Sequence, residues 1–423
     1  MAISYRYEQI CDGAAYTELI DPRLKTNNFY VHILEPLCEE NAAANALIPI
    51  ILSDSNCRYK NLTELSRKLS SLYGADVRGG VSKLADCQVV TLACGCISDK
   101  YTIDGEKIGR EVLDIFIDCL TSPYLENGVF AEDDFALKKQ ELIDEIEAEI
   151  NDKRSYALMT ASKLIYDGEP CSVSVRGERS AAEQLTPESV YRRYKELLKT
   201  GRIEIIFAGN DISDENKERL FTAIRSLERE YTEKCSFERS KKKSEPVRES
   251  ERMDIVQSKM VMAYKTDYDN PEALQLFNAV YGGTPFSKLF ENVREKLSLC
   301  YYCSSGINRR KGTMIIDSGV EHGNINAAEE EIKNQLEAMC SGDFTDEAVE
   351  NSRLSLINGV RGIGDNPRKT AEWYFRQCLD EKKISPEEEM ELIKAVTRED
   401  IIKAAKSLVP DTVYILTGKE VKE

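Results

Sequence analysis

The pattern of apolar and polar residues along the first half of the chain predicts strands and helices in turn. Residues 27–35 alternate in the manner of a β-strand. Residues 61–74 place four leucines on one face of a helix that ends at a glycine, and residues 77–95 have the pattern of a two-stranded hairpin. Two long helices are expected at 108–120 and 133–150. This mixture indicates an α+β fold in which helices pack on a sheet.

The second half of the chain repeats the organisation of the first half. Residues 185–210 and 396–420 each open with a threonine placed to cap a helix, continue as an amphipathic helix and end in a short apolar strand that stops at a glycine. Three further pairs of residues match at a constant offset of 214 positions: Phe130 with Phe344, Arg154 with Arg368, and Ala157 with Ala371. We therefore predict two homologous α/β-sandwich domains.

A change in composition marks the division between the two domains. Residues 231–252 are highly charged, contain a proline and show little apolar periodicity, which is typical of an interdomain linker. The helical pattern at 214–228 still belongs to the first domain. We therefore expect an N-terminal repeat domain at 1–230, a linker at 231–252 and a C-terminal repeat domain at 253–423.

Composition and charge argue against several kinds of partner. The 423 residues include 57 Lys and Arg against 74 Asp and Glu, and the net charge of −17 argues against nucleic acid and anionic membranes. No secretory signal is recognised, and no apolar run approaches the roughly 20 residues that span a bilayer. The thirteen cysteines are interpreted as reduced thiols, and those in CGC at 94–96 and CYYC at 300–303 as buried thiols of strands. We therefore expect a cytoplasmic protein.

The most specific motif lies in the second half, at residues 281–306 (YGGTPFSKLFENVREKLSLCYYCSSG). It resembles the C-terminal half of the insulinase/pitrilysin-like (inverzincin) zinc peptidases, which include the mitochondrial processing peptidase. That family has a Gly-Gly turn, a Ser-(Arg/Lys)-Leu-Phe helix, Arg-Glu-Lys, and a tyrosine seven positions after the arginine. The family's usual Leu-Gly-Leu is replaced here by Leu297-Ser298-Leu299, followed by Cys300. Chain length and the internal repeat also agree with the family.

The resemblance implies that Arg294 and Tyr301 bind substrate. In the family, the arginine and tyrosine of this motif hydrogen-bond the substrate's carbonyl near the scissile bond. A guanidinium offers fixed donors that keep their charge, and a phenol can donate to a developing oxyanion. The alternative is that Arg294 forms an ordinary salt bridge and Tyr301 packs in the core. Tyr302, on the opposite face of the strand, is expected to be structural.

The zinc motif of the family is absent from the chain. Catalytic members carry His-x-x-Glu-His on the first helix after the opening strand, where two histidines hold the metal and the glutamate deprotonates a water. The corresponding helix at 45–56 has Ala46, Pro49 and Ile50 at these positions. None of these side chains can bind zinc or act as a base. The whole chain contains only two histidines.

The remaining candidate ligands are interpreted as structural. His32 precedes Glu35 by three positions in a strand-like segment, so their side chains are expected on opposite faces. His322 follows a strand and has no Glu-His pair beside it. The family's third ligand corresponds to the acidic helix at 140–150, whose glutamates we interpret as a solvated face: Glu145, Glu147 and Glu149. No nucleophilic triad or phosphate-binding loop is recognised in the sequence.

Two functions of different classes follow from these observations. The first is the noncatalytic subunit of a heterodimeric zinc peptidase. In this hypothesis the chain carries no metal or other cofactor, a homologous partner holds the zinc, and an extended peptide adds to a sheet edge of the partner. Some bacterial pairs of this kind process small peptides, and the sequence resembles their zinc-less member. The second is a catalytically inactive homodimeric scaffold or peptide-binding protein of the same fold. Independent hydrolase activity would need an unseen metal site and is not expected.

Overall fold

The computed structural model describes residues 3–418 and contains two compact units. Each unit is discontinuous along the chain, because each receives one short segment from the other half of the sequence. The segments are Met1–Glu147, Val173–Ser236 and Ile363–Lys383 for unit 1, and Ala148–Ser172, Phe237–Gly362 and Ile384–Glu423 for unit 2. Both units combine a sheet with packed helices, which confirms the predicted α+β fold.

Unit 1 is built on a six-stranded sheet in the order β1-β2-β8-β3-β5-β4. The parallel pair is β2 with β8, and the other neighbours are antiparallel. Its strands are β1 (Ser4–Cys11), β2 (Ala14–Ile20), β3 (Thr26–Pro36), β4 (Asp76–Leu84), β5 (Cys87–Ile97) and β8 (Arg202–Gly209). The sequence predicted β3 and the β4–β5 hairpin at nearly these positions. A short hairpin lies outside this sheet: β6 (Leu125–Glu126) and β7 (Val129–Phe130).

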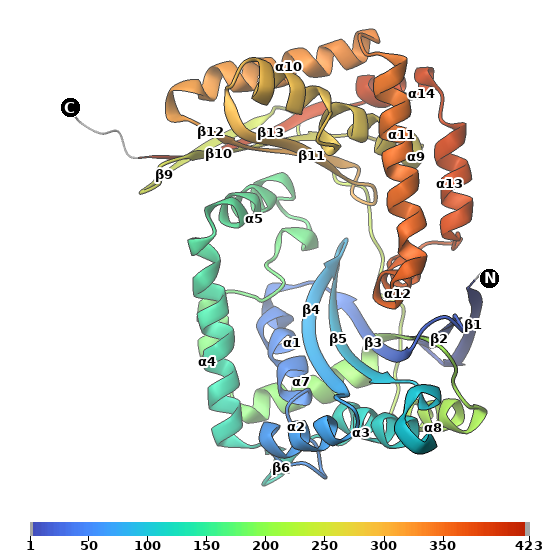
Figure 1. Ribbon diagram of the computed structural model, residues 1–423. Coiled ribbons are helices and arrows are strands. Elements are labelled where there is room, and N and C mark those ends of the chain that lie inside the picture. The colour runs from blue at the N-terminus through green and yellow to red at the C-terminus, as the bar shows by residue number, and fades with distance from the viewer. Residues whose placement is uncertain (1–2, 419–423) are drawn as a thin grey trace. The chain divides into compact units, whose positions relative to one another are not determined.

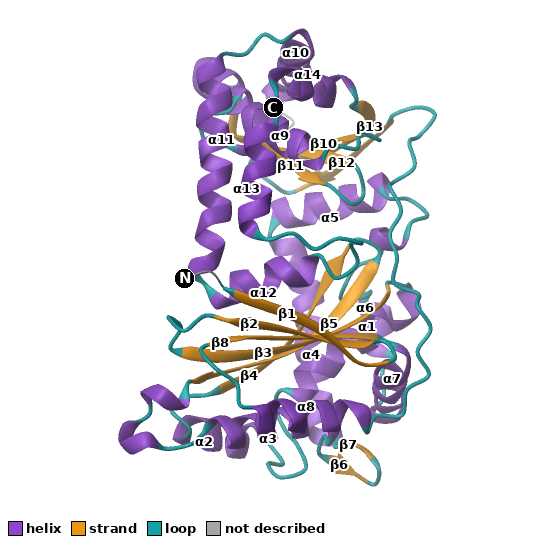
Figure 2. Cartoon of the chain, turned by 90° about the vertical axis from the view of Figure 1, so that its right-hand side faces the viewer, coloured by secondary structure: helices purple, strands orange, loops and turns teal. Residues whose placement is uncertain are grey.

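Helices cover both faces of the sheet of unit 1. They are α1 (Glu39–Leu52), α2 (Leu62–Ser71), α3 (Gly109–Thr121), α4 (Glu132–Ala148), α6 (Arg179–Glu183), α7 (Pro187–Thr200), α8 (Asp214–Arg225) and α12 (Pro367–Arg376). Figure 2 shows α3 and α8 on one face and α12 on the opposite face. Apolar side chains of β3 alternate between the two faces of the sheet and pack in a different core on each face. Val31 belongs to the main core with Leu47 of α1, whereas Leu34 packs in the smaller core with Phe375 of α12.

Unit 2 is built on a five-stranded sheet in the order β11-β12-β10-β13-β9. Its strands are β9 (Val247–Met253), β10 (Ser258–Lys265), β11 (Cys300–Asn308), β12 (Thr313–Val320) and β13 (Val409–Gly418). In the first half of the sequence, β4, β5, β3 and β8 form the same run of neighbours as β11, β12, β10 and β13. The internal repeat in the sequence is therefore visible as a repeat in sheet topology.

The helices of unit 2 also lie on both faces of its sheet. They are α5 (Lys153–Ile165), α9 (Pro271–Asn278), α10 (Ile325–Ser341), α11 (Asp346–Arg361), α13 (Pro386–Ala395) and α14 (Arg398–Lys406). Figure 1 shows α10 on one face of the sheet and α5 on the other. Ile332 of α10 packs with Ile316 of β12, whereas Ala161 of α5 packs with Val261 of β10. Thus α5 and α12, which come from equivalent places in the two repeats, each cover the corresponding face of one sheet.

Two local predictions differ from the structure. The end of the predicted linker forms β9, which pairs in parallel with β13. Its charged residues are tolerated because β9 is an edge strand with mostly exposed or half-exposed side chains. The sequence also predicts that Gly282 and Gly283 break the preceding helix, whereas both glycines lie in a π-helical turn that continues it, η5 (Ala279–Gly283). A Cβ on Gly282 would lie 2.7 Å from Leu289 Cδ1, so glycine permits close packing at this turn.

Candidate functional site

Arg294 and Tyr301 lie on two consecutive elements of unit 2. Arg294 is on the π-helical segment η6 (Leu289–Lys296), and Tyr301 is the second residue of the edge strand β11. Between them, Ser298 has a φ of 51°, the left-handed conformation that glycine adopts most easily. Ser298 stands where the family usually has glycine. The turn therefore keeps a glycine-like conformation although the glycine is lost.

A β-bulge places Tyr301 outside the regular pairing of β11. Cys300 pairs with Val320 and Tyr302 pairs with Gly319, so Tyr301 is the extra residue of the bulge. Its side chain is 60 % exposed, which rules out the core position considered as an alternative. The bulge also allows the cysteines on either side of the two tyrosines, at 300 and 303, to be buried together in the core of unit 2.

The side chains of Arg294 and Tyr301 have weak local partners and remain accessible. The Arg294 guanidinium lies over the Phe290 ring at 4.6 Å and 3.6 Å from a carboxylate oxygen of Glu295, with 42 % of its side chain exposed. The Tyr301 hydroxyl donates to Oε1 of Glu321 at 3.2 Å. This hydrogen bond to a carboxylate raises the pKa of Tyr301. The phenol therefore stays protonated at neutral pH, and its single O–H, which is donated to Glu321 here, can turn to a ligand instead.

Tyr302 has the structural role expected for it. Its ring is half-buried beneath the Arg154 guanidinium, at 4.4 Å, and its hydroxyl donates to Oδ1 of Asp317 at 3.2 Å. Burial, followed by the charge of Asp317, raises the pKa of Tyr302 well above its ordinary value. Sequence reasoning identified Tyr301 but not its acceptor Glu321. The only signal for that acceptor is a carboxylate directly after a predicted strand.

The residues at the zinc-motif positions do not fit a zinc ion. Ala46, Pro49 and Ile50 lie on α1, and none has an atom that can donate a lone pair to a metal. Ala46 and Pro49 are buried. The backbone of Pro49 packs so closely on β4 that a Cβ on Gly79 would lie 1.8 Å from its carbonyl oxygen. The side of α1 next to β4 is therefore closed by close packing.

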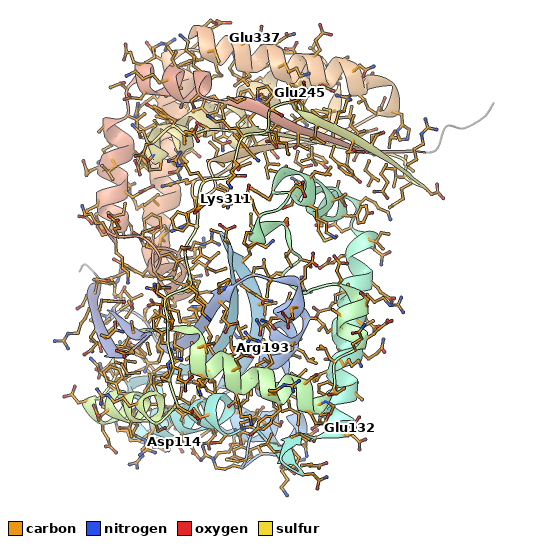
Figure 3. The ribbon with its side chains drawn as sticks, turned by 180° about the vertical axis from the view of Figure 1, so that it is seen from behind. Asp114, Glu132, Arg193, Glu245, Lys311 and Glu337 are labelled. Atoms are coloured by element: carbon orange, nitrogen blue, oxygen red, sulfur yellow. The ribbon has the colours of Figure 1, made fainter. Side chains whose placement is uncertain are left out.

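A buried polar network that the sequence did not predict fixes α1 to its neighbours. Asn45 Nδ2 donates to Gln88 Oε1 at 2.9 Å, and Arg193 Nε donates to Asn45 Oδ1 at 2.9 Å. The Arg193 guanidinium also pairs with Glu35 and with Glu196. Burial lowers the pKa of Arg193 from its ordinary value. Figure 3 labels Arg193, which joins α7 to α1 and β3 through these contacts.

The acidic helix that corresponds to the family's third ligand has a solvated face. Glu145 pairs with Arg176 at 3.1 Å and Glu147 pairs with Arg179, and all four side chains are well exposed. In the described part of the chain, no group of three potential His, Cys, Asp or Glu ligands includes a residue of α1 or of the segment 140–150.

The two histidines serve packing and hydrogen bonding. His32 is 6 % exposed, stacks on Phe375 with ring centroids 3.8 Å apart, and places Nδ1 2.9 Å from Thr91 Oγ1. Burial lowers its pKa to about 3. In unit 2, His322 Nδ1 lies 2.5 Å from Ser258 Oγ.

Among the described residues, no helix is both long enough and apolar enough to cross a membrane.

The chain is similar to one protein family and to several known proteins. Residues 184–356 match the family described as "Peptidase M16 inactive domain". The "Probable inactive metalloprotease YmfF" of Bacillus subtilis (strain 168) is 28 % identical over 403 residues, which cover 94 % of each chain. The crystal structure of a conserved protein from Enterococcus faecalis V583 has a TM-score of 0.91 and 26 % identity, covering 99 % of this chain and all of that one. The peptidase M16 inactive domain from Pseudomonas fluorescens shares the fold, with a TM-score of 0.79 at 15 % identity and 99 % of each chain covered.

Proposed function

Because the chain belongs to the insulinase/pitrilysin-like (M16) peptidase family and has no zinc-binding side chains at the motif positions, we propose that it is the noncatalytic subunit of a heterodimeric zinc peptidase. A homologous partner supplies the zinc and its ligands. This chain supplies part of the surface that binds the peptide and carries no cofactor of its own. We place the complex in the cytoplasm, where its many buried thiols stay reduced.

Several observations support a noncatalytic role. The relative from Bacillus subtilis, which matches the chain over nearly its whole length, is named as a probable inactive metalloprotease. At the motif positions, Ala46, Pro49 and Ile50 offer neither ligands nor a base, and Gly79 packs against the same helix. A zinc peptidase needs metal ligands and a general base, because the metal binds the attacking water and the base removes a proton from that water.

The observation that carries the substrate-binding part of the proposal is the exposure of Tyr301 on a bulge beside Glu321. A tyrosine retained for packing would be buried, but this side chain is 60 % exposed. Glu321 accepts a hydrogen bond from its hydroxyl and limits its orientation. Arg294 likewise keeps an exposed guanidinium. A scaffold would require neither accessible donor, which favours the peptidase subunit over the homodimeric scaffold.

The proposal is tested by mixing the purified chain with a zinc-motif homologue encoded near it and measuring peptide cleavage. We expect activity only in the mixture. Arg294→Ala and Tyr301→Phe should each reduce kcat/KM, by up to about 10²-fold if the donor acts on the developing oxyanion. Lys296→Ala, on the same segment as Arg294, and Tyr101→Phe, another exposed tyrosine, are matched controls that should leave cleavage unchanged.

Other outcomes of the same mixing experiment would favour the alternative. If the chain forms a stable homodimer in sedimentation velocity and does not associate with the homologue, the scaffold is the better account. If the complex forms and cleaves peptide but Arg294→Ala and Tyr301→Phe behave like their controls, the substrate-binding role of these two residues is wrong.

A further inference from the structure

Unit 1 contains a cavity of about 460 Å³ that the proposed function has not yet used. The volume lies within the range of roughly 300–1,000 Å³ typical of ligand pockets. All of its lining residues belong to unit 1. One wall is the edge strand β4 from Arg78 to Leu84, and the other wall is α12. Strands β3 and β5 contribute four further lining residues: Tyr30, His32, Thr91 and Ala93.

The cavity is cationic although the chain carries a net charge of −17. Its charged lining consists of four cations and one carboxylate: Arg78, Lys83, Arg368, Arg376 and Glu372. Three of the cations have partners: Arg376 with Glu372 at 2.6 Å, Arg78 with Asp76 at 2.5 Å, and Lys83 with the Val173 carbonyl at 2.7 Å. Arg368 is exposed and forms no ion pair with any residue between 3 and 418.

The equivalent arginine of the other repeat shows how the charge of a side chain like Arg368 is compensated. Arg368 and Arg154 are equivalent in the two repeats, and each lies in the first turn of its helix, where the helix dipole disfavours a cation. In unit 2, Asp317 of β12 compensates Arg154 by a direct ion pair. In unit 1, β5 occupies the place of β12 but offers Thr91 and Ala93 to the cavity. Arg368 therefore lacks the carboxylate that its counterpart has.

The length of the β4 wall favours an extended ligand over a single small anion. The wall runs from Arg78 to Leu84, which is six steps of about 3.3 Å or roughly 20 Å, and Arg78 lies at one end of it. An acidic peptide presents carboxylates over such a length. Arginine is also well suited to carboxylates, because its planar guanidinium binds both oxygens. At physiological ionic strength the Debye length is about 8 Å, so these nearby cations outweigh distant acidic residues.

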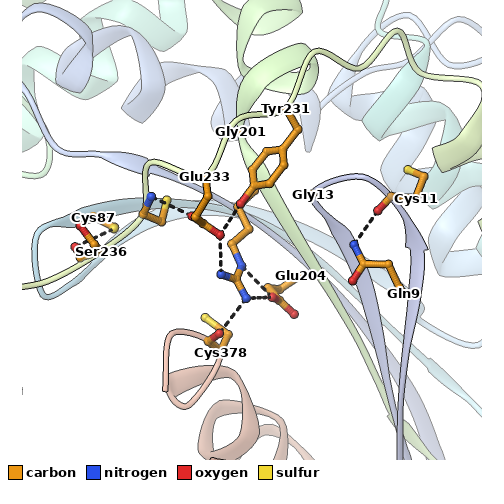
Figure 4. Close-up of polar contacts among 12 residues, drawn as sticks. Gln9, Cys11, Gly13, Cys87, Gly201, Glu204, Tyr231, Glu233, Ser236 and Cys378 are labelled. Atoms are coloured by element: carbon orange, nitrogen blue, oxygen red, sulfur yellow. Dashed lines mark hydrogen bonds and ion pairs between the residues drawn. The ribbon is translucent and has the colours of Figure 1, made fainter. Parts of the chain in front are cut away.

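The α12 wall of the cavity is held in place. Arg202 of β8 donates to the carbonyl of Cys378, just beyond α12, at 2.7 Å and to Glu204 at 2.8 Å. Figure 4 labels both acceptors. Phe375 of α12 stacks on His32 of β3. A pre-formed wall reduces the ordering that a ligand must impose and so favours binding.

We propose that this cavity binds an acidic peptide segment and that Arg368 is its main carboxylate-binding residue. The proposal rests on the proposed function, because it assigns a chemical class to the peptide that the complex processes. Part of the substrate would lie in this cavity through its carboxylates. This requirement selects acidic peptides among the possible substrates.

The test uses the full chain without any partner, so its failure is distinguishable from failure of partner-dependent cleavage. Isothermal titration calorimetry compares a peptide of alternating Glu and Ser with its Gln-for-Glu counterpart. We expect the acidic peptide to bind at least about tenfold more tightly, and Arg368→Gln to weaken it by about tenfold, since a lost charge-assisted hydrogen bond has an effect of this size. Lys369→Gln, adjacent on α12 but outside the cavity lining, should leave the affinity unchanged.

Three results would overturn the proposal. Equal affinity for the two peptides would show that carboxylates are not recognised. Equal weakening by Arg368→Gln and Lys369→Gln would show a general charge effect without a site. Competition by glutarate as strong as that by the peptide would assign the cavity to small anions. The fluorescence of Trp373 on α12 checks that each variant keeps its fold.

Discussion

Replacement of His32 by glutamine is expected to remove much of the acid sensitivity of unit 1. His32 is buried against Phe375, its Nδ1 contacts the Thr91 hydroxyl, and cations line the adjoining cavity. Burial opposes a positive charge on the imidazole, because it removes the water that would solvate the charge. Burial accordingly lowers its pKa to about 3, whereas an unfolded histidine has a pKa near 6.5.

The direction of the pH dependence of stability follows from the state, folded or unfolded, that binds a proton at the higher pH. Between pH 6.5 and 3 the unfolded chain is protonated at residue 32 and the folded chain is not, so stability decreases as the pH falls through this window. Above pH 6.5 the stabilisation by the neutral imidazole is fully present. With these two pKa values, the free energy of unfolding of the wild type should fall by about 2 kcal/mol more than that of His32→Gln when the pH is lowered from 7 to 5.

Urea unfolding at the two pH values measures this difference. Trp373, the only tryptophan of the chain, lies on α12 of unit 1 and reports on the unfolding of that unit. His322→Gln is the matched control, because His322 belongs to unit 2 and should leave the pH dependence of the Trp373 transition as in the wild type. If wild type and His32→Gln lose equal stability between pH 7 and pH 5, His32 is not held neutral by burial and the reasoning fails.

Two further predictions concern the packing of each unit and can be checked by differential scanning calorimetry. Lys265→Met should destabilise unit 2 by about 1–3 kcal/mol, because Oδ1 of the buried Asp411 carboxylate loses its ion-pair partner at 3.1 Å while Lys243 still pairs with Oδ2. A change near zero would contradict this role of Lys265. Gly79→Ala should destabilise unit 1 by about 1–3 kcal/mol, because the new Cβ would collide with the Pro49 carbonyl. Gly80→Ala is the matched control, since a Cβ there meets no atom within 4 Å, and equal effects of the two substitutions would refute the packing argument.

The sequence predicted those parts of the fold that depend on local pattern. The leucine spacing identified α2, the alternation identified β3, and the repeated helix–strand ends indicated two related halves. The offset of 214 positions between Arg154 and Arg368 also proved structurally meaningful, because both begin helices that cover a sheet. That α5 and α12 each pack with the opposite repeat depends on long-range contacts, which no local pattern contains.

The candidate site was predictable to a similar extent. The positions of Arg294 and Tyr301 followed from a motif, and their exposure is compatible with the proposed role. The bulge at Tyr301 depends on the register of β11 against β12, and the acceptor Glu321 becomes a neighbour only through that pairing. The burial of Arg193 could likewise not be predicted from the sequence, because its partners come from distant parts of the chain.

The central claim is that this chain contributes to a zinc peptidase without holding its zinc. The most direct test is metal analysis of the purified chain after incubation with zinc, combined with a peptide-cleavage assay of the chain alone. We expect no stoichiometric zinc and no cleavage, because Ala46, Pro49 and Ile50 provide no ligand. Stoichiometric zinc together with cleavage that a chelator abolishes would contradict the account.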